Sequence, residues 1–288
     1  MKFILEPEIP FEEAIAGVRE SDFVEIDGRR IRVREVGEGP TLVMLHGFAS
    51  SSHAFRRIIA PLSCSYRILA IDLDGFGLTE RPHDFDAYQI GNQAELITKV
   101  MRAKGVDEAV LVGHSYGCAV SMVFSVKYPE LLSKLVLISP PSDFAKKPPF
   151  YIRNGVGIRF AFFLIHALLS NGKRFHKLTL RAFFVKEALP FEDSEVYRQE
   201  MLTEGLKKTC RGYARAFAGG GASAVRYDSI EKPTLVVAGV EDTVVPVDSC
   251  VAVAESIPQS ELCTIPDCGH CPPEERPDEV IRAITDFV

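Results

Sequence analysis

The chain has no tryptophan, no long hydrophobic run and no cysteine spacing typical of a disulfide framework. No apolar run reaches the roughly 18 residues that a membrane-spanning helix needs. The first residues, MKFILEPEIPFEEAIAG, lack the apolar stretch of a signal peptide. The seven cysteines are an odd number, in a chain long enough to bury a core without disulfide bonds. We therefore expect reduced cysteines and a cytoplasmic protein.

A net positive charge is also absent. The formal net charge is -6, so the composition offers no general attraction for nucleic acid, and we expect no nucleic-acid partner. The hydrophobic content of 47% and charged content of 25% are typical of soluble globular proteins. A length of 288 residues suits one large domain, or one domain with an insertion.

Eight short apolar runs have the length and composition of β-strands. They cover residues 23–26, 31–36, 41–45, 66–71, 109–112, 134–138, 234–238 and 262–265. The first two flank Asp27-Gly28, a hairpin signal. The later runs of Val, Ile and Leu are typical of strands buried on both faces of a parallel sheet. Helical patterns at residues 94–103, 115–127 and 278–288 alternate with them, which predicts an α/β fold with a mostly parallel sheet.

A long interval without strand-like runs lies between residues 141 and 228. It begins with the proline-rich PPSDFAKKPPF, which we interpret as a linker, and ends with AGGGASA, a predicted flexible return. Between them, helical patterns cover residues 158–169, 175–184, 194–208 and 210–217. We predict a sheet core of residues 1–141 and 228–288, with a helical cap of residues 142–227. The first twenty residues resemble an N-terminal arm.

The motif GHSYG at residues 113–117 places Ser115 between two glycines. It follows a predicted strand and opens a predicted helix, which is the setting of a nucleophile elbow. The glycines permit a tight turn and a close approach of strand and helix. The helix N-terminus favours negative charge that develops near the serine. The bland alternative, a serine that only caps the helix, stays open at this point.

A serine nucleophile needs a base and a carboxylate that orients the base. His270 follows the last predicted strand, and Asp242 follows the strand before it, so both fall at the same sheet edge as Ser115. Glu241 and Asp248 are rival carboxylates. His114 adjoins the serine, but neighbouring residues on an elbow point in different directions, so we do not expect it to be the base.

An oxyanion hole needs exposed backbone N–H groups beside the nucleophile. Residues 46–48, His-Gly-Phe, follow the third predicted strand, and Gly47 allows the backbone to approach a substrate closely. The N–H groups of Phe48 and Tyr116 are the predicted donors. We expect His46 to be structural, with its ring hydrogen-bonded beneath this loop.

Five motifs together resemble the α/β-hydrolase fold superfamily, over nearly the whole chain. They are HGF at 46–48, DLDGFGLTERP at 72–82, GHSYG at 113–117, GVEDTVVP at 239–246 and CGHCPPEERPDEV at 268–280. The chain is most similar to the branch with a helical cap between strands six and seven. The resemblance implies Ser115 as nucleophile, Asp242 as acid, His270 as base and no cofactor.

Departures from the family pattern reduce the number of family reactions that we expect this protein to catalyse. Haloalkane dehalogenases and epoxide hydrolases carry an aspartate where this chain has Ser115. C–C bond hydrolases usually have Gly-Asn-Ser at the elbow and a tryptophan after the histidine, where this chain has His114 and Cys271. The usual proline in the turn at 72–77 is Asp74. We expect a serine esterase for substrates with an apolar acyl or alcohol part, and thioesters remain possible substrates. A meta-cleavage C–C hydrolase and a non-catalytic ligand-binding protein stay as alternatives.

Two other features allow more than one interpretation. Cys268 and Cys271 flank the base as CGHC, but a zinc site usually has four ligands and no second such pair exists, so we expect no metal. The predicted cap has no acid between Asp143 and Glu187, although that stretch holds nine basic residues. The basic side chains form either a solvated face or a weak contact with an anionic lipid surface or acyl substrate. Arg153 or Arg159 could pair with a substrate carboxylate.

Overall fold

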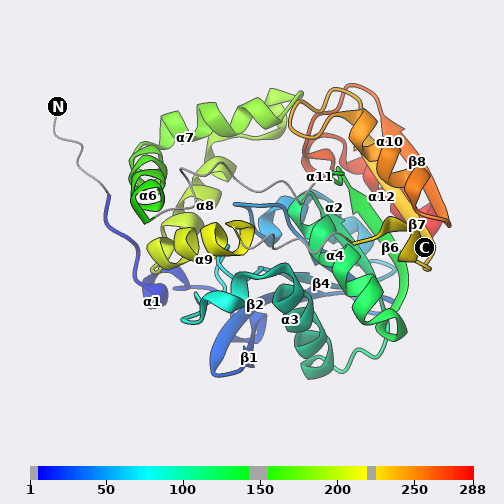
Figure 1. The fold of residues 1–288 in the computed structure, drawn as a ribbon, viewed down its shortest axis with the longest axis horizontal. Helices are drawn as coiled ribbons and strands as arrows, with labels where there is room; N and C mark the ends of the chain where they lie inside the picture. Colours follow the sequence, from blue (N-terminus) through cyan, green and yellow to red (C-terminus); the bar gives the residue numbers. More distant parts are fainter. Residues whose placement is uncertain (1–5, 143–154, 219–224) are drawn as a thin grey trace.

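The computed structural model describes residues 6–142, 155–218 and 225–288 and contains one eight-stranded sheet (Figure 1). The strands are β1 (Phe23–Ile26), β2 (Arg29–Val36), β3 (Thr41–Leu45), β4 (Arg67–Ile71), β5 (Ala109–His114), β6 (Leu132–Ile138), β7 (Thr234–Gly239) and β8 (Ser260–Ile265). Their spatial order is β1-β2-β4-β3-β5-β6-β7-β8. The predicted mostly parallel α/β sheet is confirmed.

The N-terminal hairpin is the antiparallel part of this sheet. β1 pairs with β2 and β2 pairs with β4 in antiparallel register, whereas the neighbours from β4 to β8 are parallel. Asp27 and Gly28 form the hairpin turn with φ of 51° and 73°. Such left-handed values at both positions are what a two-residue turn of this kind requires, as the Asp-Gly pair predicts.

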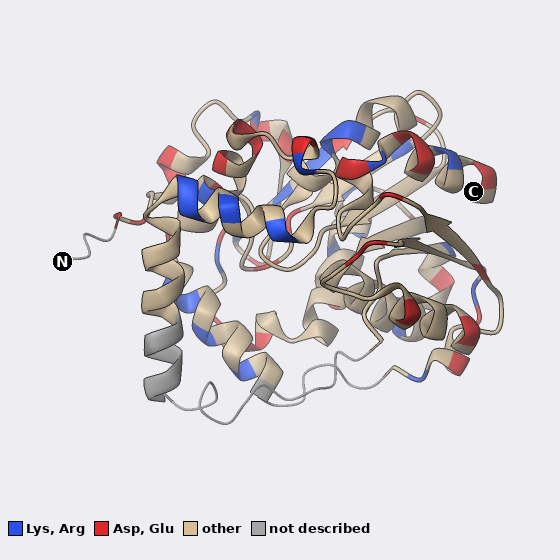
Figure 2. Cartoon of the chain, turned by 90° about the horizontal axis from the view of Figure 1, so that it is seen from above, with Lys and Arg blue, Asp and Glu red and all other residues tan. Residues whose placement is uncertain are grey.

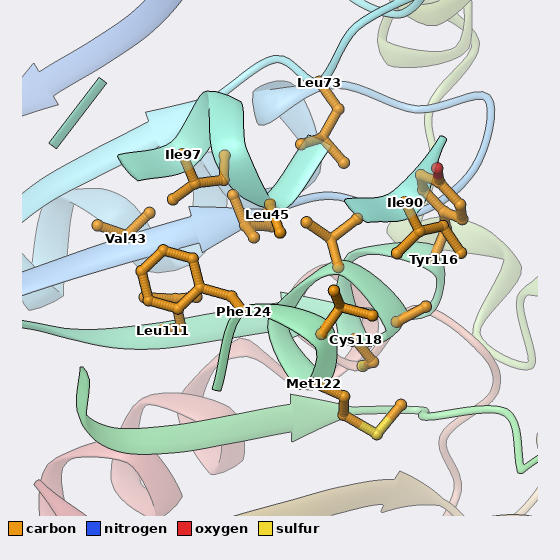
Figure 3. Close-up of a cluster of buried hydrophobic side chains, with 14 of the residues drawn as sticks. Val43, Leu45, Leu73, Ile90, Ile97, Leu111, Tyr116, Cys118, Met122 and Phe124 are labelled. Atoms are coloured by element: carbon orange, nitrogen blue, oxygen red, sulfur yellow. The ribbon is translucent and has the colours of Figure 1, made fainter. Parts of the chain in front are cut away.

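Helices cover both faces of the sheet. They are α2 (Arg56–Leu62), α3 (Ile90–Ala103), α4 (Tyr116–Lys127), α10 (Val247–Ser256), α11 (Pro272–Glu275) and α12 (Pro277–Phe287). Side chains alternate along a strand, so each face packs a different set of helices. Val43 and Leu45 of β3 belong to a buried cluster that also includes side chains of α3, α4 and α10, and Figure 3 shows Phe124 and Met122 of α4 in this cluster. The other face packs with α2 and α12.

The described residues between β6 and β7, where the sequence predicts a cap, form four α-helices. They are α6 (Gly155–Leu169), α7 (Gly172–Thr179), α8 (Phe191–Leu202) and α9 (Leu206–Ala218). They gather on one side of the sheet with the short N-terminal helix α1 (Phe11–Ala14) (Figure 1). Short 3-10 turns occupy Glu20–Asp22, Ser52–Phe55, Phe85–Tyr88, Pro129–Leu131, Leu180–Ala182, Lys186–Ala188 and Tyr227–Ser229.

The predicted bounds of two cap helices are wrong. The helix predicted over residues 194–208 is two helices, because α8 ends at Leu202 and α9 begins at Leu206. Gly205 has φ +98° between them, and its N–H donates to Glu8 of the N-terminal arm. The helix predicted over residues 175–184 ends at Thr179 and continues only as the 3-10 turn Leu180–Ala182.

Some expectations concern residues outside the described ranges. Most of the proline-rich linker and most of the glycine-rich return fall there, at residues 143–154 and 219–224. The limits assigned to core and cap therefore stay a prediction. Among the described residues, no helix has both the length and the apolar character needed to cross a membrane.

Candidate active site

The turn between β5 and α4 holds Ser115 in a strained backbone conformation. Ser115 has φ 50° and ψ -110°, a combination that residues other than glycine rarely adopt. A Cβ on Gly117 would lie 2.1 Å from the carbonyl oxygen of Leu45, and one on Gly113 would lie 2.7 Å from Gly117. Both glycines therefore permit the close approach of strand and helix that the motif predicts. The turn presents Ser115 at the carboxyl edge of the sheet.

Ser115, His270 and Asp242 form a continuous hydrogen-bonded chain. Nε2 of His270 lies 3.0 Å from Oγ of Ser115, and Nδ1 lies 2.7 Å from Oδ2 of Asp242. The carboxylate accepts a hydrogen bond from the Nδ1–H group, which leaves Nε2 unprotonated and able to accept the serine proton. Asp242 and His270 are both buried. The arrangement can turn a hydroxyl into a nucleophile and store the resulting positive charge beside a carboxylate.

Asp242 is held by its own backbone neighbours. Its Oδ1 atom accepts N–H bonds from Val244 at 2.7 Å and from Val245 at 2.8 Å, while Oδ2 faces His270. The rival carboxylates lie elsewhere. Glu241 accepts a hydrogen bond from the N–H of Cys268, and Asp248 is exposed in the first turn of α10. The structure thus places Asp242, the acid that the sequence favours, against His270, and neither rival carboxylate bonds this histidine in the described residues.

The loop after β3 lies directly against the serine. A Cβ on Gly47 would lie 3.3 Å from Cβ of Ser115 and 3.2 Å from Nδ1 of His114. Within the described part of the chain, neither the Phe48 N–H nor the Tyr116 N–H donates to another residue. Two unpaired backbone donors on the two segments that meet at the nucleophile can bind an oxyanion.

Two more histidines hydrogen-bond the loops around the serine, and neither has a described hydrogen bond to Oγ of Ser115. His46 donates from Nδ1 to the Gly47 carbonyl at 2.7 Å and accepts at Nε2 from the Leu73 N–H at 3.0 Å. It therefore hydrogen-bonds at the loop, as predicted. His114 donates from Nε2 to the carbonyl of His270 at 2.7 Å, and burial lowers its pKa to about 3. It stays neutral and bonds the backbone of the base.

Asp74, where the family pattern has proline, forms a buried ion pair. Its carboxylate binds both terminal nitrogens of Arg29 on β2, at 2.5 and 3.2 Å. Its N–H donates to Gln93 of α3, and its carbonyl accepts from the Tyr213 hydroxyl of α9. The substitution thus ties the turn after β4 to the edge hairpin, while its backbone joins the core to the cap.

An apolar cavity of about 170 Å³ opens beside Phe48, between the core loops and the cap helices. It is lined by Phe48, Ala49, Gly75, Phe76, Ile165, Met201, Leu206, Thr209, Cys210, Tyr213, Ala214 and Phe217. No charged side chain is among these lining residues. The ring of Phe48 packs edge-on against those of Phe76 and Tyr213, with centroids 5.0 Å apart in each case. The cavity can take an apolar group bound near the oxyanion donors.

Sequence reasoning missed most of the residues that line this cavity. Tyr213 and Phe217 project from α9, about 100 positions after Ser115, and the helical period of that segment was their only signal. It also missed Glu275, whose carboxylate binds backbone N–H groups on both sides of His270. Which cap residue meets the serine depends on tertiary packing that no local pattern encodes.

The cysteines beside the base are free. Burial raises the pKa of both Cys268 and Cys271, which favours the thiol over the thiolate. Among the residues that the structure describes, no cluster of three or more His, Cys, Asp or Glu side chains could hold a metal ion.

The basic residues of the cap are partly visible in the structure. Lys173, Arg174, Lys177 and Arg181, on α7 and the turn that follows it, are exposed. Figure 2 marks the lysines and arginines of the described residues in blue. Lys146, Lys147 and Arg153 lie outside the described residues, and nothing is described of the Arg159 side chain. The predicted contact of this face with an anionic lipid surface stays a prediction.

Comparison with known proteins agrees with this fold. The α/β-hydrolase fold family model matches residues 40–277. The chain is 32% identical over 248 residues to an uncharacterised hydrolase, YugF, of Bacillus subtilis, which covers 86% of this chain and 89% of that protein. It is 26% identical to a 2-hydroxy-6-oxo-6-phenylhexa-2,4-dienoate hydrolase of Burkholderia cepacia, over 93% and 96% of the two chains.

A solved structure extends the comparison. Est816, an N-acyl homoserine lactone degrading enzyme, superimposes with a TM-score of 0.75 at 29% identity, over 92% of this chain and all of its own. Two of the proteins named here are hydrolases and the third is a lactone degrading enzyme, and the matched family model spans most of the chain. The chain therefore belongs to the α/β-hydrolase fold family.

Proposed function

We propose that the protein is a serine hydrolase that cleaves carboxylic esters with an apolar acyl or alcohol part. The observation that carries the proposal is the hydrogen-bonded chain from Ser115 through His270 to Asp242, beside an apolar cavity. A serine with a positioned base attacks carbonyl carbons, and a neutral apolar cavity stabilises an uncharged substituent.

The proposed reaction has two stages. The Ser115 hydroxyl transfers its proton to Nε2 of His270 as Oγ bonds to the carbonyl carbon. The tetrahedral oxyanion accepts hydrogen bonds from the N–H groups of Phe48 and Tyr116. The imidazolium then protonates the leaving alcohol, and an acyl-serine remains. Water, deprotonated by His270, attacks this acyl group, and the protonated base returns the proton to Ser115 as the acid leaves.

Asp242 stabilises the imidazolium that forms in each stage. Its carboxylate is buried and already accepts two backbone N–H bonds, so its geometry needs little adjustment when charge develops on His270. Preorganised charge of this kind lowers the barrier because no solvent has to reorient at that moment.

Cleavage of a C–C bond is the second candidate, favoured by the likeness to the dienoate hydrolase of Burkholderia cepacia. A dienoate substrate carries a carboxylate, which a cationic side chain would pair with. The described cavity lining has no such cation, and this favours an uncharged ester instead. A non-catalytic binding role would leave the strained serine and its hydrogen-bonded base without a use.

The test is hydrolysis of p-nitrophenyl esters from acetate to palmitate, together with a 2-hydroxy-6-oxo-dienoate, by the wild type and Ser115→Ala. We expect turnover of the esters with an optimum at a chain length that fills the cavity, no turnover by Ser115→Ala, and little activity on the dienoate. A kcat/KM for the dienoate above that of every ester would instead assign C–C cleavage. Turnover of neither substrate class by folded protein would contradict a hydrolase of either kind.

A further inference from the structure

The loop that carries His270 hydrogen-bonds both to the core and to the cap. We call residues 267–271 the base loop and residues 181–185 the cap segment. The His270 N–H donates to the carbonyl of Ala182 in the cap segment, at 2.9 Å, and its own carbonyl accepts from His114. The base is therefore held by the cap as well as by the core.

A single buried carboxylate joins the two segments. Oε2 of Glu275 accepts the Phe184 and Val185 N–H groups at 2.8 Å, and the Gly269 N–H at 3.0 Å. Its Oε1 atom accepts the Cys271 N–H at 3.0 Å. The two base-loop donors are the residues immediately before and after His270. Bonds from N–H groups to an ionised carboxylate are about twice as strong as neutral ones.

The contact between the two segments leaves no room for a side chain at Gly269. A Cβ on Gly269 would lie 2.6 Å from the Phe184 nitrogen and 2.9 Å from the Ala182 carbonyl oxygen. A displacement of the cap segment would therefore carry the base loop with it or break these bonds. Thr243, next to Asp242, adds a hydrogen bond from its hydroxyl to the Arg181 carbonyl at 3.3 Å.

We propose that Glu275 is a positioning residue that fixes His270 between Ser115 and Asp242 by joining the base loop to the cap segment. The proposal rests on the role of His270 proposed above. In this proposal, the position of the cap segment determines where His270 lies between Ser115 and Asp242. The cap would then affect the catalytic geometry as well as enclose the cavity. Displacements near 1 Å at a reacting group can cost about a hundredfold in rate.

The neighbouring acid offers a matched control. Glu274 is also buried and also joins the cap to the core, since it binds Arg56 and accepts from the Tyr197 hydroxyl of α8. Its carboxylate has no described bond to the N–H groups beside His270. Loss of Glu274 should therefore lower stability without moving the base, whereas loss of Glu275 should move it.

The experiment compares wild type, Glu275→Gln and Glu274→Gln as full-length protein. One readout is the rate of labelling by a fluorophosphonate probe. The other is the downfield NMR resonance of the His270 Nδ1 proton bonded to Asp242, assigned by its loss in His270→Ala. A glutamine amide cannot accept at its nitrogen, so Glu275→Gln loses bonds on one side of the carboxylate. We expect labelling of the folded Glu275→Gln to slow roughly tenfold or more, with a weakened resonance, and Glu274→Gln to match wild type in both.

The outcomes separate this proposal from the proposed function. Wild-type labelling rate and resonance in folded Glu275→Gln would overturn the positioning role, and so would equal losses in both variants. If Glu275→Gln does not fold, Glu275→Asp gives the same comparison, with slower labelling in support and an unchanged rate against. If neither folds, amide exchange in wild type decides: Gly269 and Cys271 must be protected together with Phe184 and Val185. A wild type that is never labelled contradicts the proposed function, while the resonance still tests Glu275.

Discussion

Nε2 of His270 lies 3.0 Å from Oγ of Ser115, although 155 positions separate the two residues in the sequence. The sheet produces this proximity. Ser115 follows β5 and His270 follows β8, and both strands end at the same edge because all strands from β3 to β8 run parallel. Sites of α/β sheets form at the carboxyl ends of strands for this reason.

The cavity should set the chain length of the acyl or alcohol group. Ala214→Phe places a ring in the cavity, so each methylene it excludes should lower kcat/KM for long p-nitrophenyl esters by about fourfold. Short esters should be little affected, and Ala214→Ser serves as the control for the substitution itself. An unchanged chain-length profile in Ala214→Phe would show that this cavity does not receive the substrate.

The elbow should not tolerate a side chain at Gly117. Because an added Cβ would lie 2.1 Å from the Leu45 carbonyl oxygen, Gly117→Ala should lower the free energy of unfolding by about 3 kcal/mol. Gly91→Ala is the matched control, since that Cβ would meet only the flexible end of Lys127, and it should raise stability by about 0.5 kcal/mol. Urea unfolding measures both, and equal effects would refute the argument from close approach.

Removal of one partner of the Arg29–Asp74 ion pair should lower the free energy of unfolding more than removal of both. Asp74→Leu alone leaves the largely buried Arg29 guanidinium without its carboxylate and should destabilise by about 3 kcal/mol. The double variant Arg29→Leu with Asp74→Leu removes both charges and should lose much less stability. A double-variant cycle by thermal unfolding checks this. If the double loss equals the sum of the two single losses, the side chains are not coupled.

Glu200 should make the stability fall as pH rises. Burial and then the nearby Asp72 raise its pKa from 4.5 to about 8, so the folded protein holds a proton that the unfolded chain releases. Its stability contribution is complete below about pH 4.5 and is lost as the pH rises toward 8. Glu200→Gln imitates the protonated form, so it should gain stability relative to wild type as the pH rises through this range.

Thermal unfolding across this pH range, with Glu204→Gln as the exposed control, measures the Glu200 effect. The difference between Glu200→Gln and wild type should grow with pH, whereas the Glu204→Gln curve should stay parallel to wild type. Parallel curves for all three proteins would show that Glu200 titrates normally in the folded state.

The sheet could be predicted from sequence because its strands are short runs of Val, Ile and Leu with clear ends. The three residues of the hydrogen-bonded chain could be found as well, since Ser115, Asp242 and His270 each follow a predicted strand. Edge position and chain order were enough to group them. The distances between them required the folded sheet.

The cap was less predictable, because its structure depends on contacts across the chain. The break between α8 and α9 accompanies pairing of Ile9 with Thr203, and Gly205 is its only local signal in the sequence. The end of α7 likewise accompanies the bonds of Phe184 and Val185 to Glu275, ninety or more positions away. Two adjacent acids after His270 carried no signal that one of them binds the base loop.

The most direct test of the central claim is labelling with a fluorophosphonate probe of wild type, Ser115→Ala and His270→Ala, each verified as folded by circular dichroism. An activated serine requires both the hydroxyl and its base, so we predict covalent labelling of wild type, none of Ser115→Ala, and labelling of His270→Ala slower by at least about a thousandfold. Labelling of Ser115→Ala at the wild-type rate, or no labelling of folded wild type, would contradict Ser115 as the nucleophile.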